Sequence, residues 1–291
     1  MDVLQPTDLT QALAAIADDP GALLLAGGTD LMVAVNEGAV AVERVIALRA
    51  VPEIVGWRVD GDDVVIGAGT TYAALATPEV AAVAPALAHA ARTVGSPQIR
   101  NAGTIGGNLA TASPAGDTLP VLVAGDATVE CASVHGTRSV AARDFLTGPK
   151  RTALRTGELI TAVRIPRARG PQDYLKVGVR NAMVIAVASL ALVVDLDRRR
   201  LAVGLGSVGP TALVAPDAAE WLAERLDWSA DGVGLADPTD AAAFADRVAA
   251  VAAPIDDHRS TAAYRRHAIG VLARRALVRA CGAGPTSEIA A

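Results

Sequence analysis

Two short segments rich in glycine and hydroxyl side chains could bind a ligand in this 291-residue chain. The first is AGGTDL, residues 26–31, which joins an apolar predicted strand to a predicted short helix. The first N–H groups of a helix lack acceptors within the helix, so they and the Thr29 hydroxyl can donate to an anion. The Asp30 carboxylate would repel a phosphate, and we expect it to cap the helix instead.

The second segment is SPQIRNAGTIGGNLATASPAGD, residues 96–117. It shows neither helical nor strand periodicity, so we expect a long, polar, flexible loop, and such loops in compact domains usually bind something. The pair Gly106-Gly107 lets the backbone approach a ligand closely. Thr104, Asn108 and Thr111 supply neutral hydrogen-bonding groups, which suit a diphosphate and a polyol chain.

Two other glycine patterns are interpreted as structural. GLGSVG, residues 204–209, fits the GxGxxG dinucleotide fingerprint, but Pro210 follows and no helical pattern begins for several residues. The fingerprint needs a helix that opens at once toward the diphosphate, so we interpret this segment as a turn. In VVIGAGTTY, residues 64–72, Tyr72 occupies the third glycine position, and we expect a strand end followed by a helix that Thr71 caps.

Composition and charge argue against several classes of protein. The formal net charge is −5, which gives no reason to expect nucleic acid as a partner. The two cysteines, Cys131 and Cys281, are far apart and the four histidines show no paired-ligand spacing, so we expect no metal held by protein ligands. The longest uncharged apolar run, Ala182 to Val194, is too short for a membrane span and predicts a buried strand or helix. The chain starts without a basic-then-apolar leader, so we expect a soluble, cytoplasmic protein.

The chain alternates predicted strands and helices in two groups. Before residue 166 we expect strands at 23–26, 45–48, 57–59, 64–66 and 159–165, a hairpin around Gly136, and helices at 30–35, 78–84, 85–94 and 118–124. The breaker-rich stretch 166–171 marks a domain boundary. Beyond it we expect antiparallel strands at 174–177, 186–194 and 201–205, then helices near 217–226, 238–252 and 260–281. This order predicts two small α/β lobes and a C-terminal α+β domain.

Five motifs together resemble one protein family. They are AGGTDL, QIRNAGTIGGNLATASPAGD, GELITAVRIP at 157–166, YLKVGVRNAM at 174–183 and PIDDHRSTAAYRRH at 254–267. In this order they resemble the FAD-binding medium subunit of molybdenum hydroxylases, a family that includes the xanthine dehydrogenase and carbon monoxide dehydrogenase flavoproteins. The piece ATASPAGD is more similar to the xanthine dehydrogenase type.

The resemblance implies an α+β fold. Its first part is the two-lobed FAD-binding fold of vanillyl-alcohol-oxidase (PCMH-type) flavoproteins, and its second is a C-terminal α+β domain like that of the carbon monoxide dehydrogenase flavoprotein. The domains would be a first FAD-binding lobe at 1–55, a second at 56–167, the C-terminal domain at 172–284 and a tail at 285–291. Some members hold an extra iron–sulfur cluster in this subunit, but two cysteines are too few for it.

The family also implies which residues bind FAD. The first glycine loop wraps the FAD diphosphate and the second does so from the other side. The matching positions are Leu24, Leu25, Ala26, Gly27, Gly28, Thr29, Asp30, Leu31, Val94, Thr104, Ile105, Gly106, Gly107, Asn108, Thr111, Asp117, Ile160 and Lys176. Val94 stands where some members have an aromatic residue. Lys176 is expected to stabilise the anionic reduced flavin near its pyrimidine edge, and the alternative is an exposed strand lysine.

The function implied is that of an electron-transfer oxidoreductase subunit with no catalytic side chain of its own. Electrons would pass from partner [2Fe–2S] clusters through FAD to NAD+ or another acceptor. The partners would be a large molybdopterin-binding subunit and a small subunit with two [2Fe–2S] clusters, as a dimer of heterotrimers. The basic helix at 260–281 has an apolar face that is either solvated or docks these partners. Two alternatives stay open: a stand-alone FAD-dependent oxidase or reductase, and an assembly protein that has lost FAD.

Overall fold

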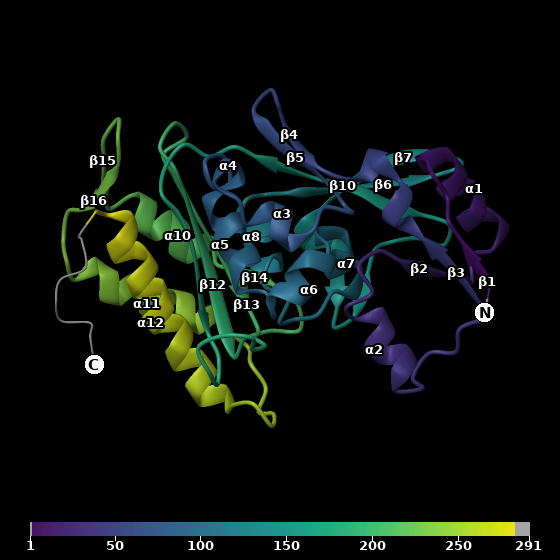
Figure 1. The fold of residues 1–291 in the computed structure, drawn as a ribbon. Helices are drawn as coiled ribbons and strands as arrows, with labels where there is room; N and C mark the ends of the chain where they lie inside the picture. Colours follow the sequence, from purple (N-terminus) through teal and green to yellow (C-terminus); the bar gives the residue numbers. More distant parts are fainter. Residues whose placement is uncertain (1, 283–291) are drawn as a thin grey trace.

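The structure is a computed structural model that describes residues 2–282, and the predicted tail at 285–291 lies outside that range. The chain forms an elongated molecule with the N-terminal sheet at one end and the last helices at the other (Figure 1). Three main sheets and three buried apolar clusters follow one another along it. This mixed architecture confirms the predicted α+β class. Within residues 2–282, no helix combines the length and the apolar character that crossing a membrane requires.

The N-terminal lobe is built on a small parallel sheet. Its strands are β1 (Asp2–Leu4), β2 (Leu23–Leu25) and β3 (Arg44–Ala47), in the order β1-β3-β2. Helix α1 (Leu9–Asp18) connects β1 to β2 and packs its buried side against β3. Helix α2 (Leu31–Asn36) comes after β2 and before β3 in the chain. The carboxyl ends of parallel strands meet at one edge, so the segments that follow β1, β2 and β3 lie close together. The first glycine loop is one of them.

The second lobe is a five-stranded antiparallel sheet covered by short helices. The order is β4-β5-β10-β6-β7, with β4 (Trp57–Asp60), β5 (Asp63–Gly67), β6 (Thr128–Ser133), β7 (Gly136–Ala141) and β10 (Leu159–Pro166). The helices are α3 (Tyr72–Leu75), α4 (Pro78–Ala81), α5 (Pro85–Thr93), α6 (Pro97–Ala102), α7 (Ile105–Thr111), α8 (Leu119–Ala124) and α9 (Ala142–Phe145). A ribbon of β8 (Leu146–Gly148) and β9 (Arg151–Thr152) completes the lobe. The hairpins expected at 57–66 and around Gly136 are confirmed.

Segment 96–117 is not the long flexible loop that the sequence predicts. It holds helices α6 and α7, and each begins at a side-chain cap. Ser96 Oγ accepts a hydrogen bond from the Ile99 N–H at 3.3 Å, and Thr104 Oγ1 accepts one from the Gly107 N–H at 3.0 Å. The prediction was wrong because helices this short are determined by their caps, while apolar periodicity becomes visible only over longer segments.

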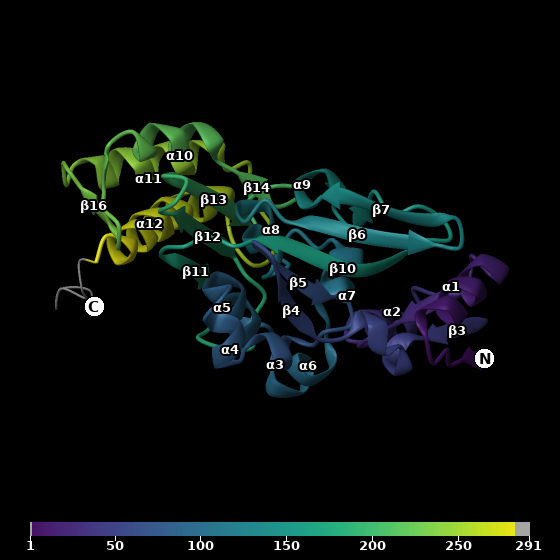
Figure 2. The ribbon, with the colours of Figure 1, turned by 90° about the horizontal axis from the view of Figure 1, so that it is seen from above.

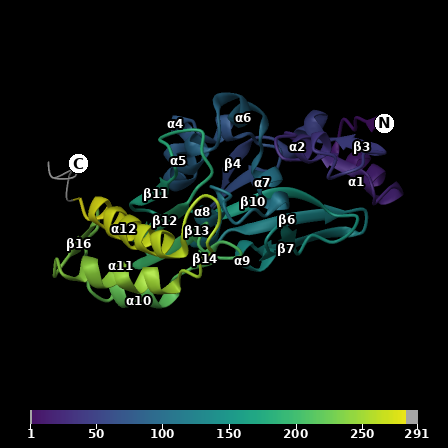
Figure 3. The same ribbon diagram turned by 90° about the horizontal axis from the view of Figure 1, so that it is seen from below.

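The C-terminal domain is a four-stranded antiparallel sheet between two layers of helices. Its elements are β11 (Gln172–Val177), β12 (Ala188–Asp195), β13 (Arg200–Gly206), β14 (Leu213–Val214), α10 (Pro216–Ala223), α11 (Asp240–Val251) and α12 (Ala262–Ala280), with a ribbon of β15 (Leu226–Trp228) and β16 (Val233–Leu235). One face of the sheet packs against the domain's own helices α10, α11 and α12, and the other is covered by α5 and α8 of the second lobe (Figure 2 and Figure 3). In β12, Leu190 and Leu192 lie on the first face, and Ala191 and Val193 on the second. All eight residues of β12 are therefore buried, which confirms the buried strand predicted from the apolar run.

The GxGxxG match at 204–209 serves packing between a strand and a helix. Gly204 lies in β13, where a Cβ would stand 1.9 Å from the carbonyl oxygen of Pro120 in α8. The strand continues to Gly206, so the expected turn begins only at Ser207. Among the described residues no helix follows before Pro216, and the helix that a dinucleotide fingerprint requires is therefore missing.

The apolar face of α12 is buried inside the chain. Its side chains at Ile269, Leu272, Ala273, Ala276, Leu277 and Ala280 belong to the core formed with β12 and α11. The apolar face is therefore not solvated, and the docking of partner subunits by this helix stays a prediction. The basic side of the helix, with Arg274 and Arg275, is the part that faces solvent.

The start of α12 is fixed by a buried arginine. Arg265 donates to Asp257 Oδ1 at 2.6 Å and to the carbonyl oxygens of Val187 and Ser207 at 2.8 and 3.0 Å. The N–H of Arg259 also donates to Asp257, at 2.8 Å. These bonds, first that from the Arg259 N–H and then that from Arg265, lower the pKa of Asp257 to about 2.

The variant Asp257→Asn is expected to lose about 1.5–3 kcal/mol of stability at neutral pH, because charge-assisted hydrogen bonds of a buried arginine are lost. A carboxylate whose folded-state pKa is depressed stabilises the protein fully above its ordinary pKa of 3.8, and this contribution disappears as the pH falls through about 2. Unfolding followed by circular dichroism at a series of acidic pH values should show that the free energies of unfolding of the two proteins converge toward pH 2. A difference in free energy of unfolding that is independent of pH would contradict this account.

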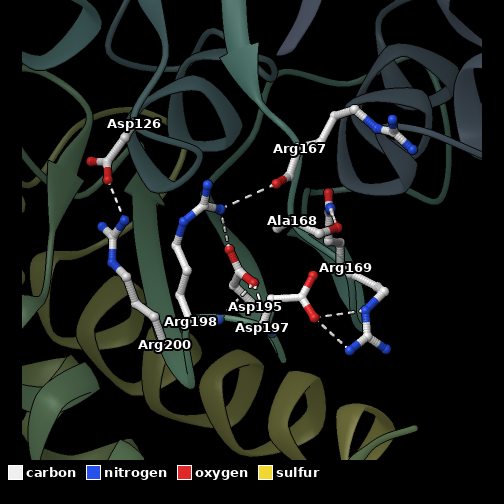
Figure 4. A network of polar contacts seen from close by, with 9 residues as sticks. Asp126, Arg167, Ala168, Arg169, Asp195, Asp197, Arg198 and Arg200 are labelled. Carbon is white, nitrogen blue, oxygen red and sulfur yellow. Dashed lines mark hydrogen bonds and ion pairs between the residues drawn. The ribbon is translucent and has the colours of Figure 1, made fainter. Parts of the chain in front are cut away.

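The junction between the second lobe and the C-terminal domain carries a network of ion pairs (Figure 4). Its members are the pairs Arg198–Asp195, Arg169–Asp197 and Arg200–Asp126. Arg198 also donates to the carbonyl oxygen of Arg167 in the linker, at 3.3 Å. The arginine side chains are about half exposed, so solvent screens each pair and its contribution to stability is small. Through Arg169 and the Arg167 carbonyl oxygen, this network attaches the linker to the C-terminal domain.

Candidate functional site

The two glycine loops meet in the structure. Gly27 packs directly on the backbone at the end of α6, where a Cβ would stand 2.0 Å from the Ala102 carbonyl oxygen and 2.9 Å from Gly103 Cα. A side chain of any size would push these segments apart. Gly27 therefore joins the N-terminal lobe to the second lobe at the point where both predicted binding loops lie.

The first loop presents N–H groups without protein acceptors. Gly28 has φ +71°, a left-handed conformation that turns the chain after β2. For the N–H groups from Gly27 to Asp30 we find no acceptor anywhere in residues 2–282. Unpaired N–H groups where a loop enters a helix favour an anion. The cap predicted at Asp30 is wrong, because its backbone is helical rather than extended and its carboxylate makes no capping bond.

The start of α7 is different, because protein acceptors already hold its donors. These bonds run from Ile105 to the Thr70 carbonyl, from Gly106 to the Ala68 carbonyl and from Gly107 to Thr104 Oγ1, at 3.1, 2.8 and 3.0 Å. The acceptors at 68–70 belong to the VVIGAGTTY segment, and Thr71 there caps α3 as the sequence predicts. That segment is interpreted above as purely structural, yet it anchors the second glycine loop.

The two glycines of α7 have different surroundings. A Cβ on Gly106 would stand 2.7 Å from the Ala68 carbonyl oxygen, so Gly106 is needed for packing. A Cβ on Gly107 would meet only Thr104 Oγ1, at 3.1 Å, and is otherwise open. Gly107 is therefore the position of the pair where a ligand can approach the helix backbone.

A buried ion pair connects the second glycine loop to the C-terminal domain. Lys176 Nζ on β11 lies 2.8 Å from Asp117 Oδ2, and both side chains are less than a tenth exposed. Tyr174 donates its hydroxyl to Asp117 Oδ1 at 2.7 Å, and Lys176 also donates to the Thr93 carbonyl oxygen at the end of α5. Lys176 is therefore not the exposed strand lysine considered as its alternative.

Burial shifts the pKa values of Asp117 and Tyr72, two side chains close to the second glycine loop. Burial raises the pKa of Asp117, and the Lys176 ammonium and the Tyr174 hydroxyl oppose that shift. Burial also raises the pKa of Tyr72, and the carboxylates of Asp117 and Asp30 raise it further. The Tyr72 ring packs against Gly103, in the second glycine segment.

A cavity of about 480 Å³ opens beside the first glycine loop. It is lined by residues Leu25, Ala26, Gly27 and Gly28 and by Gln5, Met32, Ala47, Arg49 and Ala50. Most of these groups are apolar, and the volume is in the range of ligand pockets. The cavity lies at the carboxyl ends of the parallel strands, which is where ligands bind in open α/β sheets.

The remaining predicted residues lie at or near these segments. Leu24 belongs to β2, Leu31 begins α2, Thr111 ends α7, Val94 follows α5, and Ile160 is buried in β10. Asn108 in α7 accepts a hydrogen bond from Thr118 at 2.6 Å, so its side-chain oxygen is engaged within the protein.

Sequence reasoning missed Tyr72, Tyr174 and Arg49. Tyr174 precedes Lys176 by two positions in a strand, and side chains at that spacing share a face, so this signal was available. Arg49 comes two residues after the end of a parallel strand, which is also a usable signal. Tyr72 could not be found, because only the tertiary packing of α3 on α6 brings it to the loops.

Comparison with known protein families confirms the resemblance. The family described as "FAD binding domain in molybdopterin dehydrogenase" matches residues 1–168, and the one described as "CO dehydrogenase flavoprotein C-terminal domain" matches residues 173–280. The N-terminal part of the chain is thus an FAD-binding domain.

Similar proteins match between 70% and 97% of the chain. The carbon monoxide dehydrogenase medium chain of Afipia carboxidovorans is 33% identical over 287 residues, covering 96% of each chain. The putative xanthine dehydrogenase FAD-binding subunit XdhB of Escherichia coli is 30% identical over 213 residues, covering 70% of this chain and 73% of its own. A crystal structure of the Cu,Mo-CO dehydrogenase contains a chain with TM-score 0.86 and 33% identity, with 97% of this chain and 98% of that one covered. The chain belongs to the family of FAD-binding medium subunits of molybdenum hydroxylases, and it is an oxidoreductase subunit.

Proposed function

We propose that this chain holds FAD between its two glycine loops and passes electrons from the iron–sulfur clusters of a partner subunit to NAD+. The residues assigned to FAD are those predicted from the sequence, from Leu24 to Leu31 and from Thr104 to Asn108, with Val94, Thr111, Asp117, Ile160 and Lys176. FAD supplies the chemistry, since a flavin accepts electrons singly and releases them as a pair. The protein has to bind the cofactor, orient it and leave one side accessible.

The contact between Gly27 and the end of α6 is the observation that carries this proposal. It brings the unpaired N–H groups of the first loop next to the second glycine segment. These donors suit a diphosphate, and the open side of Gly107 allows a cofactor to lie close to the backbone. The residues present therefore fit FAD.

Partner subunits are part of the proposal. The relatives are named medium chains or FAD-binding subunits, which indicates that those proteins work in complexes. Two cysteines are too few for the four thiolates of a [2Fe–2S] cluster, so the clusters would belong to a partner. We propose a large molybdopterin-binding subunit and a small iron–sulfur subunit as these partners, in a dimer of heterotrimers. The relatives' names refer to different substrates, so they do not favour one for this chain.

Reoxidation of the reduced complex tests the acceptor. The complex would be reduced anaerobically and mixed in a stopped-flow instrument with NAD+, a soluble quinone or oxygen, while flavin absorbance is recorded. We expect NAD+ to restore the oxidised flavin spectrum faster than the other two. If NAD+ leaves the flavin reduced while a quinone or oxygen oxidises it, the acceptor assignment is wrong. If the isolated chain is bleached by a substrate without partners, it is a stand-alone flavin enzyme.

A further inference from the structure

Tyr174 crosses the boundary between the C-terminal domain and the second lobe. It belongs to β11, yet it packs in the apolar cluster that the second lobe mainly builds, and only 5% of the residue is exposed. Its hydroxyl donates to Asp117 Oδ1, at 2.7 Å, in the second glycine segment. A buried phenolic hydroxyl requires a partner, and here that partner is a carboxylate of the candidate site.

The Asp117 carboxylate divides its two oxygens between two side chains of β11. Oδ1 accepts the bond from Tyr174, and Oδ2 accepts one from Lys176 Nζ at 2.8 Å. Tyr174 and Lys176 are two positions apart in the strand, so their side chains lie on the same face. In the part of the chain that the structure describes, we find no other donor to this carboxylate. These two bonds therefore fix its orientation.

The Lys176 ammonium keeps one donor for a ligand. An ammonium carries three N–H groups. One donates to Asp117 and another to the Thr93 carbonyl oxygen at 3.0 Å, and the third has no acceptor within residues 2–282. The Lys176 side chain is only 8% exposed, and a buried donor of this kind costs free energy until it finds a partner.

The protonation state of Asp117 decides how much of the ammonium's charge is balanced. Ionised Asp117 and Lys176 form a neutral pair, whereas a protonated Asp117 leaves one positive charge. Burial raises the pKa of Asp117, and Lys176 and then Tyr174 oppose that shift. The third titratable side chain that interacts with Asp117 is Tyr72 of α3, whose pKa is raised by burial and then by the Asp117 carboxylate.

We propose that Tyr174 is a positioning residue: it holds the Asp117 carboxylate for Lys176 and so determines how strongly the Lys176 ammonium stabilises the reduced flavin. The residues predicted to bind FAD include Asp117 and Lys176 but not Tyr174. The inference rests on the proposed function, because the flavin is the group on which the ammonium acts. Tyr174 acts through Asp117 and takes no part in the redox chemistry.

Tyr174→Phe tests the first step, the control of Asp117, without any cofactor. The variant removes the hydroxyl and keeps the ring in the core. Because the hydroxyl opposes the effect of burial, the Asp117 carboxyl group should take up its proton at a higher pH than in the wild type. Infrared difference spectra of the flavin-free full chain over a pH series report the protonated carboxyl group. The substitution Asp117→Asn in both backgrounds identifies its band.

The second step is measured on the FAD-loaded chain. Between the pH values at which Asp117 titrates in the wild type and in Tyr174→Phe, the carboxyl group is neutral only in the variant. The unbalanced ammonium should then raise the midpoint potential of the flavin above that of the wild type, and the difference should disappear at higher pH. In the Asp117→Asn background, Tyr174→Phe should leave the potential unchanged, because the group through which the tyrosine acts is absent.

Tyr264→Phe is the matched control, because Tyr264 on α12 is 51% exposed and its hydroxyl has no hydrogen-bond partner in the described chain. A Tyr174→Phe chain in which Asp117 titrates as in the wild type would overturn the proposal. An equal change of potential with and without Asp117 would also overturn it, since Tyr174 would then have only a structural role. A wild-type chain that takes up no FAD is a distinct result, which contradicts the proposed function itself.

Discussion

Replacing Gly27 by alanine is expected to abolish FAD retention and to lower the free energy of unfolding by roughly 1–3 kcal/mol or more. The new Cβ would stand 2.0 Å from a backbone carbonyl oxygen of α6, and backbone has no rotamer with which to move away. The N-terminal lobe must then separate from the second lobe, and the two glycine loops with it. Thermal unfolding and the flavin absorbance of the purified chain measure both effects.

Gly107→Ala separates binding from folding. An alanine in α7 meets only Thr104 Oγ1, and alanine is favoured over glycine inside a helix by roughly 0.5–1 kcal/mol, so the fold should be kept. FAD binding should nevertheless weaken, because the added methyl group occupies the open side where the cofactor approaches. Gly21→Ala is the control, since its Cβ would meet only Asp19 Oδ1 at 3.4 Å. If Gly107→Ala binds FAD as the wild type does, the second loop does not contact the cofactor in the way proposed.

The second large effect is expected for Lys176→Met. Removing the ammonium leaves Asp117 buried without its partner, and breaking one side of a buried pair costs about 3–5 kcal/mol unless the carboxyl takes up a proton. Burial already raises the pKa of Asp117, and the variant loses the ammonium that opposes this shift, so the pKa of Asp117 should rise further. The midpoint potential of the flavin should fall, by about 30 mV for each 1.4 kcal/mol of lost stabilisation of the reduced form.

Asp117→Asn and the double variant Lys176→Met/Asp117→Asn complete the comparison. Because the double variant leaves no unpaired charge, it should be more stable than the single variant Lys176→Met. The flavin potential of the double variant should stay below that of the wild type, since the double variant lacks the ammonium as Lys176→Met does. Spectroelectrochemical titration of each FAD-loaded protein gives these values. A potential in Lys176→Met equal to that of the wild type would remove Lys176 from this role, whatever the loss of stability.

Much of the fold follows from sequence because its longer elements carry clear patterns. The hairpin at 57–66 has a turn of acidic and glycine residues between apolar strands, and β12 shows as an uninterrupted apolar run. Helices α6 and α7 could not be recognised by periodicity, since each has fewer than two full turns. Their signals were the caps Ser96 and Thr104.

The sequence predicts which residues belong to the candidate site better than it predicts how they are arranged. Residue type and resemblance predict the glycine pairs and Lys176 as members of the candidate site. Their arrangement depends on contacts between distant segments, such as Gly27 on Ala102 and Lys176 on Asp117, which no local pattern reports. The different roles of Gly106 and Gly107 also depend on tertiary packing, because only the position of Ala68 distinguishes them.

The flavin content of the purified full-length chain, before and after addition of FAD, tests the central claim most directly. We predict a yellow protein whose flavin is released on denaturation as FAD, bound once per chain and kept through gel filtration. The flavin should stay oxidised when substrates of molybdenum hydroxylases are added to the isolated chain, and it should be reduced only with the partner subunits present. A folded, colourless chain that takes up no FAD would contradict the account.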